Sequence, residues 1–119
     1  MPKPRILQIG SLTGHSPADA ELSARYEVLP YWKAADPLAF LQEHAESIEV
    51  IVTSANIGCK AEVIQALPNL KAICSWGVGY DSIDIDAAKR QQVVVSNTPD
   101  VLNDCVADLA WGLLIAASR

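Results

Sequence analysis

The stretch Leu70-Lys-Ala-Ile-Cys-Ser-Trp-Gly-Val-Gly-Tyr-Asp81 runs from an apolar segment into two glycines that flank a single valine. Its first five residues are typical of a buried strand, which ends before Gly77 and Gly79 remove the side chains. A chain that only has to turn can use one glycine with a neighbouring Asn, Asp or Pro. Two glycines therefore indicate that a ligand, or another segment of the chain, approaches the backbone closely here.

Similar short runs recur along the chain and alternate with segments of helical period. The predicted strands are 5–9, 26–29, 49–53, 70–74 and 93–95, and the predicted helices are 17–24, 37–45, 60–66, 84–90 and 103–118. This alternation predicts an α/β fold, a flavodoxin-like parallel sheet of about five strands with helices on both faces. The loops that follow parallel strands gather at one edge of the sheet, so we expect a binding site there.

Composition narrows the classes of function. The 119 residues are 50% apolar and 19% charged, with a net charge of -5, so the chain is expected to fold and not to bind nucleic acid or an anionic membrane. The longest apolar run, Leu109 to Ala117, is too short to span a bilayer, and a cytoplasmic location is expected. Cys59, Cys74 and Cys105 are predicted to be reduced thiols of the core, outside any disulfide or metal site.

Two segments have some features of cofactor-binding motifs. A dinucleotide fingerprint at Gly77-Val-Gly79, with Asp100 downstream, is disfavoured because Ser82 takes the third glycine position and Asp81 would face the pyrophosphate. The loop Ser11-Leu-Thr-Gly-His-Ser16 has the small residues of a flavin phosphate loop, although turn formers are common before any helix. Binding of FMN therefore stays open as an alternative.

No catalytic or metal-binding group is predicted within the chain. His15 and His44 have no nucleophile at a recognisable spacing, and surface or capping roles are expected for both. Asp81, Asp84 and Asp86 fit a turn and the first turn of a helix better than a metal site.

Four blocks, in order along the chain, carry a resemblance to a known family. They are Asn69-Leu-Lys-Ala-Ile73, Gly77-Val-Gly-Tyr-Asp-Ser-Ile-Asp84, Val95-Ser-Asn-Thr-Pro-Asp-Val-Leu102 and Val106-Ala-Asp-Leu-Ala110. They closely resemble the D-isomer-specific 2-hydroxyacid dehydrogenases, among them the glyoxylate, hydroxypyruvate and hydroxyphenylpyruvate reductases. The resemblance implies that residues 1–102 form the substrate-binding domain, and that 103–119 begin an interdomain helix leading to a Rossmann domain.

The same resemblance implies roles for individual residues. Ala55, Asn56, Ile57 and Trp76 would shape the substrate pocket, and the amides of Gly77, Val78 and Gly79 would face the substrate carboxylate. Val78 and Val106 would lie near the nicotinamide of NAD(P)H. The family's cofactor glycines and its catalytic Arg, Glu and His have no counterpart in this chain, which is therefore expected to be inactive alone. One departure is Gln91-Gln92, where the family usually has a glycine at a helix end.

The function implied is reduction of a small 2-oxoacid, such as glyoxylate or hydroxypyruvate, by hydride transfer within a homodimer. The alternative is a stand-alone flavodoxin-like module that binds FMN or a small carboxylate. The helix predicted at 103–118 is apolar nearly all round, which indicates that a second domain or a partner subunit covers it.

Overall fold

The computed structural model of the protein describes residues 3–11 and 17–119. The elements in chain order are β1 (Arg5–Gln8), α1 (Pro17–Arg25), β2 (Glu27–Pro30), the 3-10 helix η1 (Tyr31–Lys33), α2 (Pro37–His44), β3 (Val50–Ser54), α3 (Ala61–Ala66), β4 (Ala72–Trp76), α4 (Ile85–Arg90), β5 (Val94–Ser96) and α5 (Asn103–Ala117). Every strand and helix predicted from the sequence is present, and the bounds differ by at most two residues.

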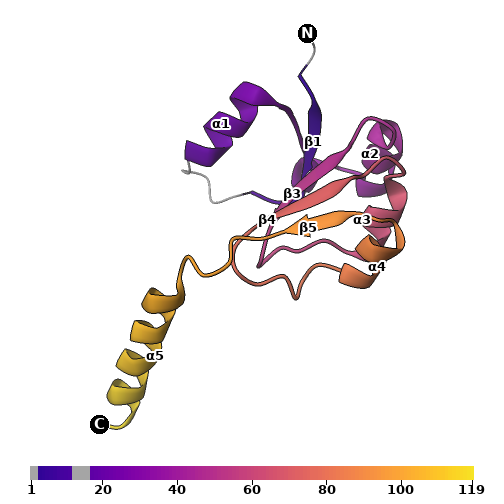
Figure 1. Cartoon of the computed structure of the whole chain (residues 1–119). Coiled ribbons are helices and arrows are strands. Elements are labelled where there is room, and N and C mark those ends of the chain that lie inside the picture. Colours follow the sequence, from indigo (N-terminus) through magenta and orange to yellow (C-terminus); the bar gives the residue numbers. More distant parts are fainter. Residues whose placement is uncertain (1–2, 12–16) are drawn as a thin grey trace.

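The five strands form one parallel sheet in the order β2-β1-β3-β4-β5 (Figure 1). This is the flavodoxin-like order, so the predicted fold class is confirmed. The strand order reverses between β1 and β3, and the carboxyl ends of all five strands lie along one edge. The loops that follow β1, β3, β4 and β5 are therefore neighbours in space.

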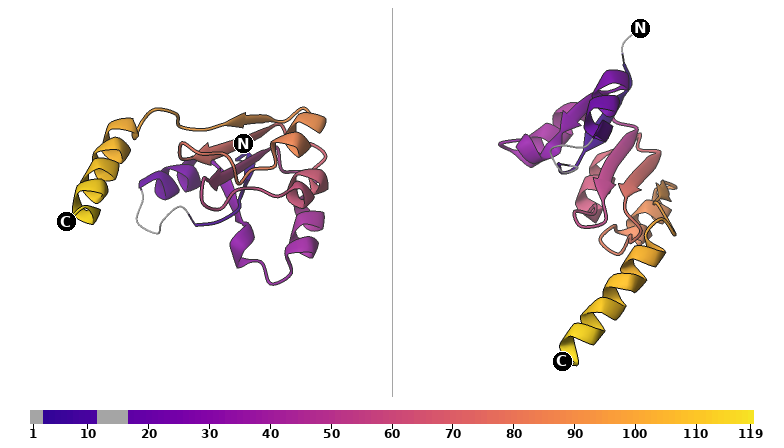
Figure 2. Two further views of the ribbon diagram at one scale, coloured as in Figure 1. Left: turned by 90° about the horizontal axis from the view of Figure 1, so that it is seen from below. Right: turned by 90° about the vertical axis from the view of Figure 1, so that its left-hand side faces the viewer.

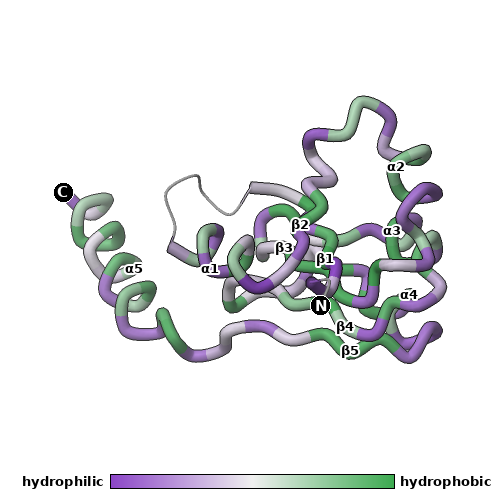
Figure 3. Tube along the Cα trace, turned by 90° about the horizontal axis from the view of Figure 1, so that it is seen from above, coloured by the Kyte–Doolittle hydropathy of each residue, from purple (hydrophilic) through white to green (hydrophobic). Residues whose placement is uncertain are grey.

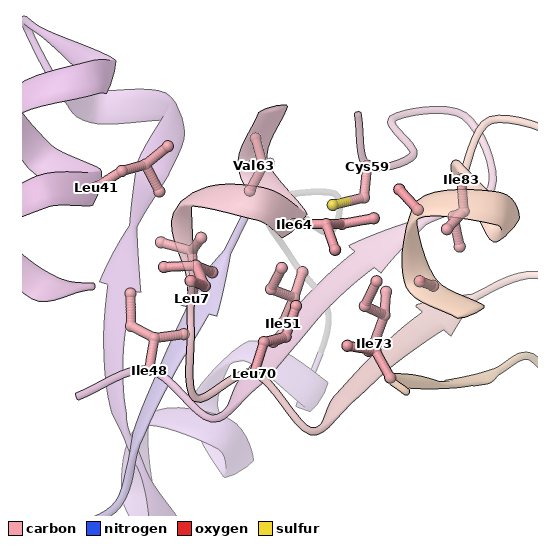
Figure 4. Close-up of a cluster of buried hydrophobic side chains, with 14 of the residues drawn as sticks. Leu7, Leu41, Ile48, Ile51, Cys59, Val63, Ile64, Leu70, Ile73 and Ile83 are labelled. Carbon is pink, nitrogen blue, oxygen red and sulfur yellow. The ribbon is translucent and has the colours of Figure 1, made fainter. Parts of the chain in front are cut away.

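One face of the sheet carries the core. Leu7, Ile51 and Ile73 lie on the three central strands, and their side chains are fully buried (Figure 4). They pack against buried side chains of α2, α3 and α4, among them Leu41 and Ile64. Because side chains alternate along a strand, the intervening residues must point to the opposite face.

The opposite face is covered less completely. Helix α1 lies over it, but none of its residues is buried, and a channel of about 580 Å³ remains between α1 and sheet residues such as Val52 and Cys74. Cys74 is exposed on this face, and Cys105 is exposed on α5. The prediction that all three cysteines belong to the core is therefore wrong for these two. It holds for Cys59, where burial raises the pKa of the thiol to about 12.

Helix α5 projects from the body of the molecule (Figures 1 and 2). All of its residues are exposed, and the radius of gyration is 16.7 Å, whereas a compact chain of this length has about 13.5 Å. Hydrophobic residues recur along the helix (Figure 3). Within residues 3–11 and 17–119, no helix combines the length and the apolar character needed to cross a bilayer.

The end of α4 is the place where the resemblance led us to expect a glycine. Gln92 adopts a left-handed conformation with φ of 59°. The Val93 amide donates to the Ala88 carbonyl at 2.8 Å, and the Gln92 amide donates to the Lys89 carbonyl at 3.1 Å. These two bonds form a Schellman motif, which normally places glycine at the position of Gln92.

We predict that Gln92→Gly stabilises the fold by about 0.5–1 kcal/mol, because glycine reaches positive φ without the steric cost of a Cβ. Gln91→Gly is the matched control. Gln91 has a φ of -94° and its side chain donates to the Leu67 carbonyl at 3.3 Å, so glycine there should destabilise. Urea unfolding measures the stability of both variants. A lower urea midpoint for Gln92→Gly than for the wild type would contradict the claim that the positive φ of Gln92 is strained.

Candidate functional site

A cavity of about 840 Å³ lies at the carboxyl edge of the sheet. It is open to solvent and is bounded by the loops after β3 and β4 and by the first turns of α5. Its lining residues are Ser11, Ser54, Ala55, Asn56, Trp76, Gly77, Val78, Leu102, Asn103, Val106, Ala107 and Ala110. The cavity therefore lies beside the β1/β3 point at which the strand order reverses, where ligands bind in this fold.

The structure brings most of the predicted site residues to this cavity. Ala55, Asn56, Trp76, Gly77, Val78 and Val106 line it. Ile57 does not, because its side chain packs against Gly10, where an added Cβ would collide with the Ile57 Cδ1. Gly79 is exposed beside the cavity without lining it.

The two glycines of the β4 loop differ in what requires them. Gly77 has a φ of +130°, and an added Cβ would lie 2.8 Å from the Cβ of Ala55. The chain's own packing therefore explains Gly77. Gly79 has no heavy atom within 4 Å of an added Cβ, and its φ lies outside the left-handed region. No contact among the described residues requires a glycine at 79, and the space beside its backbone is free for a ligand.

The amides of the loop also differ in whether they are occupied. The Gly77 amide donates to Thr98 Oγ1 at 3.1 Å, and the Gly77 carbonyl accepts from the Thr98 amide at 2.9 Å. The Val78 carbonyl accepts from Asn97 Nδ2 at 2.7 Å. The amides of Val78 and Gly79 have no hydrogen-bond partner among the described residues. Of the three predicted anion-binding donors, the Gly77 amide is thus occupied, and the Val78 and Gly79 amides are free of bonds to described residues.

The loop after β3 is fixed against the loop after β4. The Ala55 amide donates to the Trp76 carbonyl at 3.0 Å, and the Ala55 carbonyl accepts from Ser82 Oγ at 2.6 Å. Ser82 stands where a dinucleotide fingerprint would have its third glycine, and its hydroxyl here joins the two loops. The wall of the cavity is therefore held by hydrogen bonds that do not depend on a ligand.

Comparison with known proteins identifies the family to which the chain belongs. Residues 11–117 match the model of the D-isomer specific 2-hydroxyacid dehydrogenase catalytic domain. The chain belongs to this dehydrogenase family. It is 44% identical over 101 residues to hydroxyphenylpyruvate reductase from Plectranthus scutellarioides, covering 85% of this chain and 32% of the relative. It is 41% identical over 99 residues to glyoxylate/hydroxypyruvate reductase A from Arabidopsis thaliana, covering 83% of this chain and 32% of the relative.

Solved structures of the dehydrogenase family share the fold. A 2-hydroxyacid dehydrogenase from Ketogulonicigenium vulgare Y25 superposes with a TM-score of 0.86 at 39% identity, covering 100% of this chain and 37% of that one. An NADPH-dependent glyoxylate/hydroxypyruvate reductase from Sinorhizobium meliloti, in complex with NADP and malonate, gives 0.71 at 30% identity, covering 95% and 34%. The chain spans about a third of the length of the curated relatives it matches.

Two other residues considered for chemistry have structural roles. The His44 ring packs against Phe40 with centroids 4.8 Å apart and planes inclined at 60°, and Asp84 caps α4 by accepting from the Ala87 amide at 2.9 Å. His15 and the loop from residue 12 to Ser16 lie outside the described residues, and only Ser11 of the possible flavin loop is seen, at the cavity. Among residues 3–11 and 17–119, no cluster of His, Cys, Asp and Glu could hold a metal ion.

Sequence reasoning assigned no role to two groups of residues at the site. Asn97 and Thr98 were recognised within a family block, but their bonds to the β4 loop span about twenty residues and have no local signal in the sequence. Leu102, Asn103, Ala107 and Ala110 line the cavity because the first turns of α5 lie beside it. The helical period of α5 could have shown that these residues share a side with Val106.

We predict opposite outcomes for the two glycines. Gly77→Ala should destabilise the chain by about 2–3 kcal/mol, because the new Cβ meets Ala55 at a positive φ. Gly79→Ala should change stability by less than about 0.5 kcal/mol, because nothing lies near its Cβ. Thermal and urea unfolding measure both variants. Equal destabilisation by the two substitutions would show that Gly79 also serves packing.

Proposed function

We propose that the chain is the substrate-binding part of an NAD(P)-dependent D-2-hydroxyacid dehydrogenase, with residues 1–102 as the substrate-binding domain and 103–119 as the start of the interdomain helix. The observation that carries the proposal is that the amides of Val78 and Gly79, beside an open cavity, have no hydrogen-bond partner among residues 3–11 and 17–119. Backbone N–H groups bind an anion without a cationic side chain. A 2-oxoacid offers such an anion in its carboxylate.

The cavity suits a nicotinamide as well as the oxoacid. Val78 and Val106 are 37% and 60% exposed, and both line the cavity with apolar side chains. Val78 thus offers an apolar side chain to the cofactor and, through its amide, a donor to the substrate. Bound NAD(P)H supplies the hydride. The role of this chain is to hold the carboxylate and so orient the carbonyl carbon toward the cofactor.

The remaining catalytic groups are proposed to come from the rest of the enzyme. No histidine or arginine lines the cavity among the described residues. The described residues therefore offer no candidate for the proton donor or for the group that polarises the keto oxygen, and we expect the 119-residue chain alone to be inactive. Relatives carry names of glyoxylate and hydroxyphenylpyruvate reductases, which makes small 2-oxoacids the substrates to test.

We further propose that the enzyme is a cytoplasmic homodimer. All three cysteines are unpaired and two of them are exposed, which suits a reducing compartment. Trp111 and Leu113 of α5 are 66% and 61% exposed, and they point to nearly opposite sides because two residues turn a helix by about 200°. One covering surface cannot bury both sides. The second domain and a partner subunit together can.

The test of the function combines an assay with a titration. The full-length enzyme should oxidise NADH or NADPH with glyoxylate or hydroxypyruvate, whereas the 119-residue chain should not. In NMR spectra of the 119-residue chain, glyoxylate should shift the amides of Val78 and Gly79 more than that of Gly77, whose N–H is bound to Thr98. The shifts should be weak, because the chain supplies only part of the pocket.

Glycolaldehyde is the matched control ligand, because it lacks the carboxylate and should leave these amides unchanged. If glyoxylate shifts only residues 11–16 and leaves the loop 77–79 unchanged, the carboxylate assignment is wrong. If FMN purifies with the chain at stoichiometric level, the flavodoxin-like alternative replaces the dehydrogenase.

We predict that α5 of the isolated chain is either frayed or buried in a self-associated interface. Leu113→Glu should lower any association measured by sedimentation, because it places a charge on the exposed apolar helix. Leu38→Glu is the control, since Leu38 is 68% exposed on α2, away from α5. A monomeric chain whose amides at 105–117 exchange as slowly as those of the central strands would show that α5 needs no cover.

A further inference from the structure

The loop that carries the two free amides is held from one side. Three hydrogen bonds join it to the segment between β5 and α5: Gly77 N–H to Thr98 Oγ1 at 3.1 Å, Thr98 N–H to the Gly77 carbonyl at 2.9 Å, and Asn97 Nδ2 to the Val78 carbonyl at 2.7 Å. Asn97 is half-buried and Thr98 is exposed. Both residues lie directly after the short strand β5.

These bonds fix the direction of the free amides. The C=O and N–H groups of a trans peptide point in opposite directions. Because the Gly77 carbonyl is held by Thr98, the Val78 N–H of the same peptide points away from Thr98. Because the Val78 carbonyl is held by Asn97, the Gly79 N–H points away from Asn97. The two donors therefore face away from the segment that holds them.

The first of these two peptides is constrained by several contacts, and the second by fewer. Gly77 makes two bonds with Thr98 and also abuts Ala55. The Val78–Gly79 peptide has one bond from a described residue, the one from Asn97. Gly79 has nothing within 4 Å of an added Cβ that would restrain it. Without Asn97, this peptide is free to rotate, and the Gly79 donor loses its direction.

We propose that Asn97 is a positioning residue for substrate binding, which orients the Val78–Gly79 peptide so that its N–H meets the carboxylate of the 2-oxoacid. The proposal rests on the proposed function, since it takes the two free amides as the carboxylate site. Asn97 acts through the peptide and does not touch the substrate. Thr98 performs the same task for the Gly77–Val78 peptide, mostly through its backbone amide.

The experiment is a pair of alanine variants of the full-length enzyme. Asn97→Ala should raise KM for glyoxylate roughly tenfold and leave kcat within about twofold, because the carboxylate is held in the ground state and in the transition state alike. The inhibition constant of oxalate, an unreactive dicarboxylate, should rise in parallel. The KM for NAD(P)H should not change.

Asn69→Ala is the matched control. Asn69 Nδ2 donates to the Glu46 carbonyl at 2.9 Å, so this variant loses a bond of the same kind near the amino ends of the strands. It should lose a similar amount of stability and keep the wild-type KM for glyoxylate. Equal KM values in the Asn97→Ala and Asn69→Ala enzymes would overturn the positioning role while leaving the proposed function intact.

A titration separates the other outcomes. If the wild-type enzyme reduces no 2-oxoacid, but oxalate shifts the Val78 and Gly79 amides and Asn97→Ala abolishes the Gly79 shift, the reaction is wrong and the positioning role stands. If oxalate shifts neither amide in the wild type, both are wrong. Should Asn97→Ala not fold, Asn97→Leu is used, because leucine has nearly the same shape as asparagine but no N–H to donate to the Val78 carbonyl. A raised KM for glyoxylate is again expected, and a wild-type KM would overturn the proposal.

Discussion

The register between β3 and β4 is the constraint on which the site depends. The two strands pair over five residues, and the last pair joins Ser54 to Trp76. The residues that follow, Ala55 and Gly77, are thereby forced together, and the Ala55 amide continues the ladder by donating to the Trp76 carbonyl. Gly77 must then lack a side chain. A shift of one residue would send the core residues Ile51 and Ile73 to the open face.

The register also decides which backbone amides of the β4 loop remain for a ligand. Gly77 packs against Ala55 and donates its N–H to Thr98 Oγ1, so its amide is unavailable to a ligand. Val78 and Gly79 lie beyond the close contact, and their amides have no partner among the described residues. The Asn97 side chain and the Thr98 amide hold the carbonyls on the other side of the same peptides. In the proposed carboxylate site, these groups control the orientation of the peptides without reaching the anion.

Local patterns in the sequence predicted the fold well, and predicted contacts across the sheet poorly. The alternation of β-branched runs with helical segments was enough to predict five strands, five helices and the loops at the carboxyl edge. Each of these patterns involves only residues that are close together in the sequence. The exposure of Cys74 was missed because an apolar context does not show that one sheet face is only partly covered by α1. The residue type at Gln92 does not indicate its positive φ, and only the resemblance pointed to Gln91-Gln92 as a departure from a helix-end glycine. The bonds from Asn97 and Thr98 depend on β4 and β5 being adjacent, which only the folded structure shows.

A crystal structure of the proposed full-length dehydrogenase with NAD(P) and oxalate tests the carboxylate site most directly. We predict one carboxylate of oxalate within about 2.7–3.2 Å of both the Val78 and the Gly79 nitrogen, with the Asn97 bond to the Val78 carbonyl still in place. Oxalate held only by side chains, or a Val78–Gly79 peptide turned with its carbonyl toward the ligand, would contradict it.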